Sequence, residues 1–421
     1  MNDSTPAATR RWTSAGRLWD LVIPAGVDPT ARKVLCARAL RAFVDGYVAV
    51  LLPAYLLALG LGVFEVGLLS TVTLAGSALA TLAVGAFGHH WPQARLLQAA
   101  ALLMAATGAG FAGFSSFWPL LVVAFVGTLN PSSGDVSVFG PIEHARLADL
   151  AAEQHARTAL FARYTLSGSL FAAFGALASA LPAWFAATSG LAMVDALRGM
   201  FALYGVAGFL TWLLYRGLPA AGAGEAVQAA TPLGPSRRTV VKLAALFSVD
   251  AFAGGLLVNA LLSLWLLQRF GLSLGAAGLF FFWAGLLTTA SQLLAPVVAR
   301  RIGLLNTMVF THIPANLFLI LAAFAPSLPL ALACLLARSA LSQMDVPTRA
   351  AFVMAVVTPA ERAAAASFTA VPRSLAAAAG PSVGAAMLAT GVLATPLVLC
   401  GALKIAYDLV LLYAFRQHDR L

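Results

Sequence analysis

The chain carries little charge for its length. Only 10% of its 421 residues are charged, whereas a soluble globular protein has about 25%. Hydrophobic residues make up 61% of the chain, so most of its surface must face lipid, and a water-soluble enzyme is excluded. Cysteine is scarce too. Cys36, Cys334 and Cys400 lie in separate apolar runs without a pairing pattern, which excludes a disulfide framework and predicts three buried thiols.

Motifs for catalysis and cofactor binding are also missing. The sequence has no nucleotide-binding glycine loop and no nucleophile–base arrangement, so we expect no enzyme activity, no ATP hydrolysis and no cofactor. His89, His90 and the acids and histidines of residues 143–155 match no tight metal-ligand spacing. We interpret them as solvated loop residues and expect no metal. Residues 1–33 are polar and basic, so we expect no cleavable signal peptide.

The chain does have many apolar runs long enough to cross a membrane as helices of about 20 residues. We predict twelve spans: 34–59, 63–87, 96–114, 117–139, 159–181, 199–215, 241–268, 274–299, 304–324, 327–355, 364–390 and 394–415. An even number of spans places both ends of the chain on one side of the membrane. The expected fold is therefore an all-α membrane protein with twelve transmembrane helices.

The two halves of the chain repeat each other at an offset of 209 or 210 residues. The matching positions are Asp135 with Asp345, Arg163 with Arg373, and segment 41–46 with segment 250–255. Since half of the chain is also about 210 residues, the two copies fill it. The repeat predicts two pseudo-symmetric six-helix bundles, and secondary transporters place their substrate site between such repeats.

The basic residues predict the topology. Seventeen of the 26 lysines and arginines lie in the tails and in the loops on the same side of the membrane, and only two lie in the opposite loops. By the positive-inside rule both termini are cytoplasmic, and we expect an inner membrane of bacterial type. The net charge of +10 is then a topology signal, and we expect no nucleic-acid partner.

Composition divides the chain into five parts. Segment 217–240 is rich in alanine, glycine and proline before a basic end, which predicts a flexible cytoplasmic linker. We also predict a charged loop at 140–158, between the fourth and fifth spans. The expected parts are an N-terminal tail (1–33), an N-terminal six-helix bundle (34–216), the linker (217–240), a C-terminal six-helix bundle (241–415) and a C-terminal tail (416–421).

With its six-plus-six spans, parallel repeats and central linker, the chain resembles the major facilitator superfamily over about residues 34–415. The loop between spans 2 and 3 keeps the family's first glycine as Gly85, but has His89 in place of the usual aspartate and Pro92 in place of the second glycine. Segment 358–362 looks like the family's loop before span 11. The resemblance implies a secondary transporter, energised by an ion gradient.

Drug–proton antiporters of this superfamily usually carry a Gly-Pro-x-x-Gly motif in span 5. Here residues 380–384 carry that motif in span 11, and residues 166–170 of span 5 contain no proline. A multidrug or lipophilic cation–proton antiporter is therefore an alternative that departs from its family pattern. A second alternative is a non-transporting membrane sensor with a transporter fold.

Charged residues inside the spans are the functional candidates, because each costs at least about 2.5–3.5 kcal/mol to insert. The candidates for the substrate or proton pathway are Arg38, Arg41, Asp45, Asp135, Arg163, Asp250, Asp345, Arg349 and Arg373. In one interpretation they form packing or gating salt bridges. In the other, the arginines bind an anionic group and the carboxylates carry protons. Arg338 adds a further cation in span 10.

Helical spacing predicts some of the pairs that these charges form. Three local pairs at i,i+4 are Arg41 with Asp45, Asp345 with Arg349, and Lys404 with Asp408. Four charges lack such a neighbour, namely Asp135, Arg163, Asp250 and Arg373, so each needs a partner on another helix, in water or on a substrate. The repeat suggests that Asp135 pairs with Arg163, and Asp345 with Arg373.

Helix breakers accompany these charges. Pro131, Pro347 and Pro372 lie beside charged residues in both halves, which predicts kinks or hinges. Polar residues such as Asn259, His312 and Gln343 are interpreted as helix–helix hydrogen bonds or as cavity lining.

Together these features predict a monomeric secondary active transporter that moves a small solute by alternating access between the bundles, with an anionic compound as one candidate solute. We expect protons to drive it through Asp45, Asp135, Asp250 or Asp345. Export by antiport is favoured because small-solute exporters are common in the family.

Overall fold

A computed structural model describes residues 27–132, 137–150, 153–219, 234–358 and 361–416. Within these residues, nine helical stretches are long and apolar enough to cross a membrane. The helices are α2 (Ala31–Ala58), α3 (Val63–Phe87), α4 (Gln93–Gly113), α5 (Phe117–Val126), α6 (Phe139–Asp149), α7 (Gln154–Leu177), α8 (Leu181–Ser189), α9 (Met193–Arg216), α10 (Arg237–Gly255), α11 (Asn259–Phe270), α12 (Leu274–Ile302), α13 (Leu304–Ala323), α14 (Leu328–Leu341), α15 (Asp345–Val356), α16 (Arg362–Ala389) and α17 (Thr395–Phe415).

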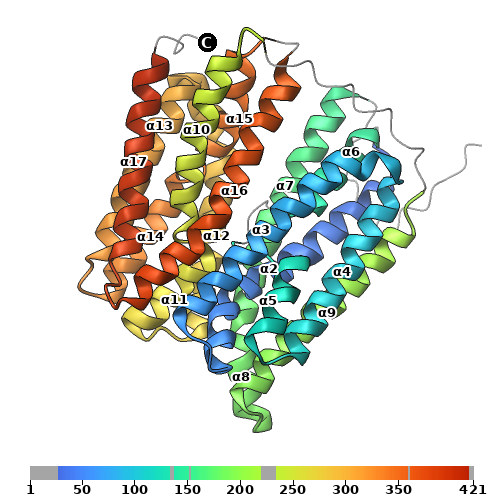
Figure 1. The fold of residues 1–421 in the computed structure, drawn as a ribbon, viewed down its shortest axis with the longest axis vertical. Helices are drawn as coiled ribbons and strands as arrows, with labels where there is room; N and C mark the ends of the chain where they lie inside the picture. Colours follow the sequence, from blue (N-terminus) through green and yellow to red (C-terminus); the bar gives the residue numbers. More distant parts are fainter. Residues whose placement is uncertain (1–26, 133–136, 151–152, 220–233, 359–360, 417–421) are drawn as a thin grey trace, which may run out of the picture.

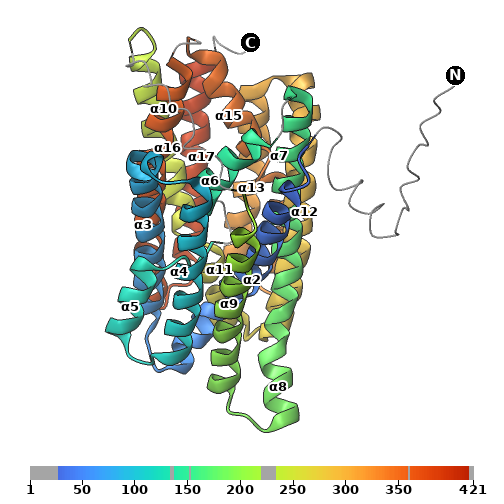
Figure 2. The same cartoon turned by 90° about the vertical axis from the view of Figure 1, so that its right-hand side faces the viewer.

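The helices form two bundles that stand side by side, α2–α9 in one and α10–α17 in the other (Figure 1). Viewed after a quarter turn, the long helices run roughly parallel to one axis (Figure 2). This confirms the predicted all-α membrane fold built from two halves. Predicted spans 4, 10 and 11 have no counterpart among the nine stretches. The residues of span 4 fall largely on α5, those of span 10 on α14 and α15, and those of span 11 on α16.

The predicted fourth span, 117–139, is not one helix. Helix α5 ends at Val126, and the chain is non-helical from Gly127 to Ser132. Pro131 explains the break, because proline lacks an N–H and its ring collides with the carbonyl four residues earlier, here that of Gly127. The hinge predicted at this proline is therefore a full interruption of the helix.

Two more predicted spans are interrupted. Span 10 breaks at residues 342–344, where Pro347 removes the hydrogen bond to the carbonyl of Gln343. Span 7 breaks at residues 256–258, just after Gly255, whose missing side chain lets α10 approach Gly380 on α16 closely. By contrast, α16 continues through Pro372. All three interruptions contribute residues to the space between the bundles, namely Ser132, Leu257, Val258, Ser342 and Gln343.

The prediction of a loop over residues 140–158 is wrong. Helix α6 covers Phe139–Asp149, and α7 begins at Gln154. Phe139, Ile142 and Leu147 are buried on one side of α6, which is the spacing of an amphipathic helix. The charged residues at 140–158 obscured this amphipathic pattern in the sequence. One of them, Glu143, is fully buried and lies on the apolar face of α6.

The bundles touch at the end where α2 stops and α3 begins, which we call the opposite end. Here α3 packs on α16, α7 on α12, and α2 on α11. Small residues permit the approach: a side-chain carbon at Gly67 would lie 2.7 Å from the carbonyl oxygen of Pro381. Hydrogen bonds that join the bundles there include Ser263 Oγ to Val50 O at 3.1 Å, Ser382 N to Thr71 Oγ1 at 2.8 Å, and Ser179 Oγ to Leu274 O at 2.9 Å.

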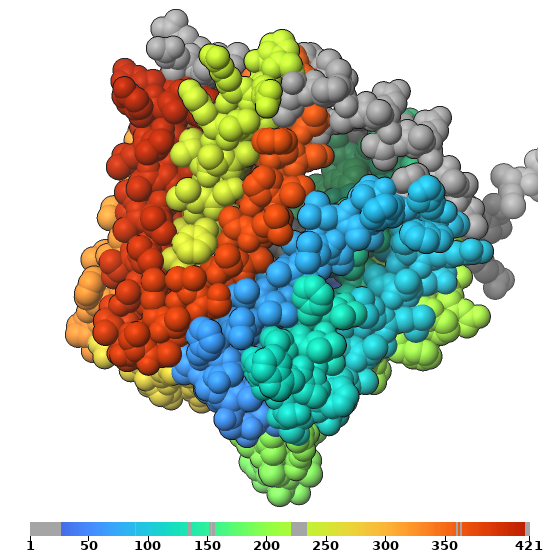
Figure 3. Space-filling view, in the orientation of Figure 1, coloured from blue at the N-terminus to red at the C-terminus, as the bar shows by residue number. Residues whose placement is uncertain are grey.

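The bundles diverge toward the other end, where α2 begins and α17 ends, which we call the terminal end (Figure 1). In the space-filling view a recess lies at this end, between the orange surface of the second bundle and the blue and green surface of the first (Figure 3). The conformation is therefore closed at the opposite end and open at the terminal end.

Glu361 ties the beginning of α10 to the beginning of α16 at the terminal end. Its carboxylate accepts hydrogen bonds from the backbone N–H of Gly234, the N–H of Ser236 at 3.3 Å and Thr358 Oγ1 at 2.7 Å. Hydrogen bonds from Ser236, Thr358 and the Gly234 N–H lower the pKa of Glu361 to about 2. The negative charge also suits the positive end of the α10 dipole.

Glu361→Gln is expected to lower the melting temperature at pH 7. Because the folded pKa lies below the unfolded value of about 4.3, this carboxylate stabilises the fold above that value and loses its contribution as the pH falls toward 2. The gap in melting temperature between the wild type and Glu361→Gln should therefore shrink between pH 5 and pH 3. A gap that is constant over this range would show that the charge of Glu361 does not act in this way.

Candidate transport site

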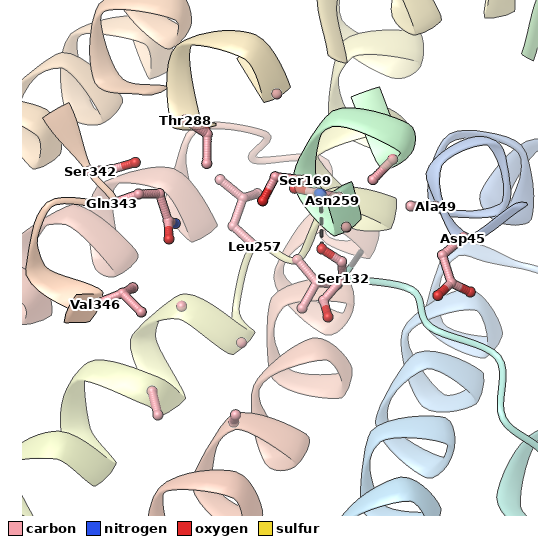
Figure 4. Close-up of a pocket in the computed structure, with 18 of the residues that line it drawn as sticks. Asp45, Ala49, Ser132, Ser169, Leu257, Asn259, Thr288, Ser342, Gln343 and Val346 are labelled. Carbon is pink, nitrogen blue, oxygen red and sulfur yellow. Dashed lines mark hydrogen bonds between the residues drawn. The ribbon is translucent and has the colours of Figure 1, made fainter. Parts of the chain in front are cut away.

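A cavity of about 620 Å³ lies between the two bundles. Residues of α2, α3, α6 and α7 line one side of it, and residues of α10–α17 line the other. In Figure 4 Asp45 faces this space from α2, while Gln343 and Thr288 come from the second bundle. Asn259 Nδ2 donates to Ser132 O at 2.9 Å across the two halves. A cavity of this size accepts a small organic molecule.

Most of the predicted pathway residues reach this cavity. Those that line it are Arg38, Asp45, Asp250, Asp345, Arg349 and Arg373. Arg41 and Arg163 lie away from the lining, and Asp135 lies outside the described residues. The cavity also takes in Arg338, His312 and Lys404, which were not on the predicted pathway.

The second bundle buries a cluster of charged side chains beside the cavity, which we call the C-terminal cluster. Its members are Asp250 on α10, His312 on α13, Asp345 and Arg349 on α15, and Lys404 and Asp408 on α17. None of the six side chains is more than 11% exposed. Charges buried to this degree must be paired, because burying an isolated ion is very costly.

Asp250 accepts hydrogen bonds from two cations. Lys404 Nζ donates to Asp250 Oδ1 at 2.6 Å, and Arg349 Nη1 donates to Asp250 Oδ2 at 3.2 Å. Arg349 also donates to Asp345 one helical turn away. The structure thus gives Asp250 the partners on other helices that the sequence required, and it contains the predicted Asp345–Arg349 pair.

The predicted pair Lys404–Asp408 is wrong. Lys404 donates to Asp250, and Asp408 instead contacts His312, with Asp408 Oδ2 2.9 Å from His312 Nδ1. The other ring nitrogen, His312 Nε2, lies 4.0 Å from Asp250 Oδ1. Spacing on α17 placed both charges on one face, but that face packs against α10 and α13, whose charged residues become the partners.

The first bundle buries a second group, which we call the N-terminal cluster: Arg41, Glu143, Tyr164 and Tyr215. Arg41 Nη2 donates to Glu143, and the hydroxyls of Tyr164 and Tyr215 donate to the same carboxylate at 2.6 and 2.5 Å. The Arg41 guanidinium also lies 3.9 Å from the ring centre of Phe139. The spacing of Arg41 and Asp45 predicted a local pair, but the buried ion pair of Arg41 is with Glu143.

Two arginines of the cavity wall have no carboxylate partner among the described residues. Arg373 is exposed to the cavity and makes no ion pair there, since Asp345, its predicted partner, is bonded to Arg349. Arg338 Nε is buried without a hydrogen bond. The described lining therefore holds five cations, Arg38, Arg338, Arg349, Arg373 and Lys404, against three carboxylates, Asp45, Asp250 and Asp345.

Arg163 resembles these arginines in one respect, because its Nη1 has no hydrogen-bond partner within the described part of the chain. Its predicted pairing with Asp135 falls outside that part.

Over the described residues, no group of three or more metal-binding side chains occurs, and Cys36, Cys334 and Cys400 are free thiols. The side chains of His89 and His155, considered above as metal ligands, are not described.

Comparisons with known proteins agree with this architecture. The family model described as Major Facilitator Superfamily matches residues 34–381. An uncharacterized membrane protein of Saccharomyces cerevisiae is 26% identical, over 90% of this chain and 92% of its own length. Among solved structures, the D-xylose-proton symporter superposes with a TM-score of 0.71 at 18% identity over 90% of this chain and 97% of its own.

Two further structures are similar. The nucleoside transporter NupG superposes with a TM-score of 0.70 at 13% identity, over 92% of this chain and 100% of its own. A bacterial homolog of the human lysosomal transporter Spinster, in an inward-facing occupied conformation, gives 0.67 at 17% identity, over 91% of this chain and 94% of its own. At such identities the likeness shows the fold.

Proposed function

The chain belongs to the major facilitator superfamily, a family of transporters and not of enzymes, and from this premise we propose that it moves a small organic anion across a membrane by alternating access, coupled to protons. The observation that carries the proposal is the charge of the cavity wall, where, among the residues that the structure describes, five cations face three carboxylates.

The surplus of positive charge favours an anionic solute. Charges in a membrane interior interact strongly because little water screens them, so two uncompensated cations attract a ligand of opposite sign. Arginine suits this role because its planar fork matches a carboxylate or phosphate with two hydrogen bonds. Arg373 and Arg338 supply the unpaired guanidinium groups.

The arrangement of the bundles suits alternating access. The close helix contacts at the opposite end form one gate, and the recess at the terminal end is the open path to the cavity. The excess of lysine and arginine in the tails and adjoining loops supports a cytoplasmic terminal end. On this assignment the conformation is open to the cytoplasm, and the membrane is the inner membrane of a cell.

A ligand screen on the detergent-purified protein tests the proposal. The probes are inorganic phosphate, citrate, lactate, tetraphenylphosphonium, xylose and uridine, each at pH 5.5 and pH 7.5. At 100 times its Kd, a ligand adds about 2.7 kcal/mol of stability. At least one anion is expected to raise the melting temperature of the wild type. The shift should disappear in Arg373→Ala and persist in the control Arg269→Ala, which removes an arginine exposed at the opposite end.

Other outcomes would redirect the proposal. A shift with tetraphenylphosphonium that depends on Asp45 would favour the multidrug antiporter, and a sugar or nucleoside shift would replace the anion. Proteoliposomes then test transport: an imposed pH gradient should drive the active anion uphill. If the protein exports its solute by antiport, as the sequence predicts, the anion should move outward. No movement, with binding intact, would favour a sensor.

A further inference from the structure

Many hydroxyl side chains inside the helices bond to the carbonyl four residues earlier in their own helix. Thr289 Oγ1 donates to Gly285 O at 2.8 Å, and Ser339 Oγ donates to Leu335 O at 2.9 Å. Such a bond satisfies the hydroxyl where lipid and packed helices exclude water. A polar side chain that lacks such a bond therefore needs water or another molecule as its partner.

Four polar side chains of the cavity lining lack an intramolecular partner. Thr288 and Gln292 lie on α12, and Ser342 and Gln343 lie at the break between α14 and α15. Within the described part of the chain, none of these four side chains makes a hydrogen bond, and their polar atoms are open to the cavity. We call these four residues the polar wall.

The helix geometry brings the four residues of the polar wall together. Thr288 and Gln292 are one helical turn apart, so they share a face of α12. Helix α12 packs against α14 and α15, and Figure 4 shows Thr288, Ser342 and Gln343 on the same side of the pocket. Non-helical backbone at membrane depth is tolerated where it lines a cavity. The polar wall is therefore one hydrogen-bonding surface of the second bundle.

The chemistry of the polar wall differs from that of Arg373, which lines the same cavity from α16. Hydroxyl and amide side chains both donate and accept hydrogen bonds, whereas a guanidinium only donates. A solute that satisfies both must carry an oxyanion together with groups that donate and accept. Alcohol hydroxyls are such groups, whereas an ammonium group only donates and would be repelled by the arginines.

We propose that the solute is an organic anion with several hydroxyl groups, a sugar acid or a sugar phosphate. Its hydroxyls bind the polar wall, and its carboxylate or phosphate binds Arg373. The anionic part of this inference rests on the proposed function, whereas the hydroxyl part rests on the polar wall.

Closure of the cavity makes this requirement stricter. In alternating access the terminal end closes over the solute, and water leaves the cavity. An anion with a purely apolar carbon chain would then leave the polar wall unpaired, and a buried polar group without a partner is costly. A hydroxylated chain replaces the hydrogen bonds that water made. Sites built to bind a hydroxyl strongly reject the analogue that lacks it.

Pairs of anions that differ chiefly in hydroxyl groups test the proposal. Gluconate and hexanoate are carboxylates with six carbons, and glucose 6-phosphate and hexyl phosphate are the corresponding phosphates. Isothermal titration of the detergent-purified wild type measures each Kd. In at least one pair the hydroxylated member should bind roughly a hundredfold more tightly, since each hydrogen bond contributes up to about tenfold in affinity. The two pairs distinguish a carboxylate from a phosphate as the anionic group.

Gln343→Met and Gln292→Met test the polar wall itself. Methionine keeps the length of the side chain and removes its hydrogen bonds. Each variant should weaken binding of the hydroxylated anion about five- to tenfold and leave the apolar member of the pair unaffected. Either variant serves if the other fails to fold. The control is Thr289→Val, whose hydroxyl is already bonded to Gly285 O, and it should bind as the wild type does.

The contrary outcomes separate this inference from the proposed function. Equal affinities within both pairs, together with loss of binding in Arg373→Ala, would overturn the inference and leave the anion transporter. Wild-type affinity for the hydroxylated anion in both methionine variants would also overturn it, as would no binding of gluconate or glucose 6-phosphate at millimolar concentrations. If sorbitol, which has hydroxyls but no charge, binds as tightly as gluconate and Arg373→Ala changes neither, the polar wall stands and the anionic solute fails.

Discussion

Lys404→Met is expected to destabilise the protein by about 3–5 kcal/mol, the usual cost of removing one partner from a buried ion pair. Lys404 Nζ is 2.6 Å from Asp250 Oδ1, and the two side chains are 11% and 4% exposed. Methionine fits the space of the lysine chain, so the loss comes from charge and not from packing. Asp250 would keep Arg349, but the C-terminal cluster would lose one of its buried cations.

Adding Asp250→Asn to Lys404→Met is expected to recover most of that loss. Replacing both members of a buried pair is often nearly neutral, whereas breaking the pair is not. The double variant also restores the wild-type charge balance, since one carboxylate and one cation are removed together. A double-mutant cycle of unfolding free energies measures the coupling. Equal losses in the single and double variants would mean that packing, and not pairing, is responsible.

Composition and helix length were enough to predict the membrane fold and its two halves. Lipid requires long apolar helices, and the high cost of each buried charge distinguishes Asp250, Asp345 and Arg373 in the sequence alone. The cost of burial alone did not predict which charged residues would pair with each other. Lys404 and Asp408 show why: spacing on one helix fixes a face, while the partner is fixed by the residues of α10 and α13 that pack against that face.

The repeat predicted equivalent positions but not equivalent chemistry. Arg41 and Asp250 align between the halves, and each is buried at the centre of an ionic cluster. Their charges are opposite, so Arg41 is paired with the carboxylate of Glu143, which also accepts from two tyrosine hydroxyls, and Asp250 is paired with a lysine and an arginine. Both α2 and α10 therefore carry a buried charge at the equivalent position, and each half pairs that charge with different residues.

Glu143→Ala should produce a second large effect, in a region that the sequence placed in a solvated loop. Glu143 is fully buried and binds Arg41, which is 2% exposed, together with the hydroxyls of Tyr164 and Tyr215. The substitution would leave a buried guanidinium unpaired, and the expected cost is about 3–5 kcal/mol. Because these side chains come from α2, α6, α7 and α9, the loss should loosen the first bundle at the terminal end.

Glu143→Gln provides the matched comparison, because its amide oxygen still accepts one hydrogen bond while its charge is gone. We expect Glu143→Gln to lose stability, but less than Glu143→Ala, and Arg41→Met combined with Glu143→Gln to recover part of the loss. Thermal unfolding in detergent measures the order of the three variants. A Glu143→Ala protein as stable as the wild type would mean that water, and not Arg41, surrounds this carboxylate, as a solvated loop requires. Burial on the apolar face of α6 predicts the contrary, because a side chain that is 0% exposed is out of contact with bulk water.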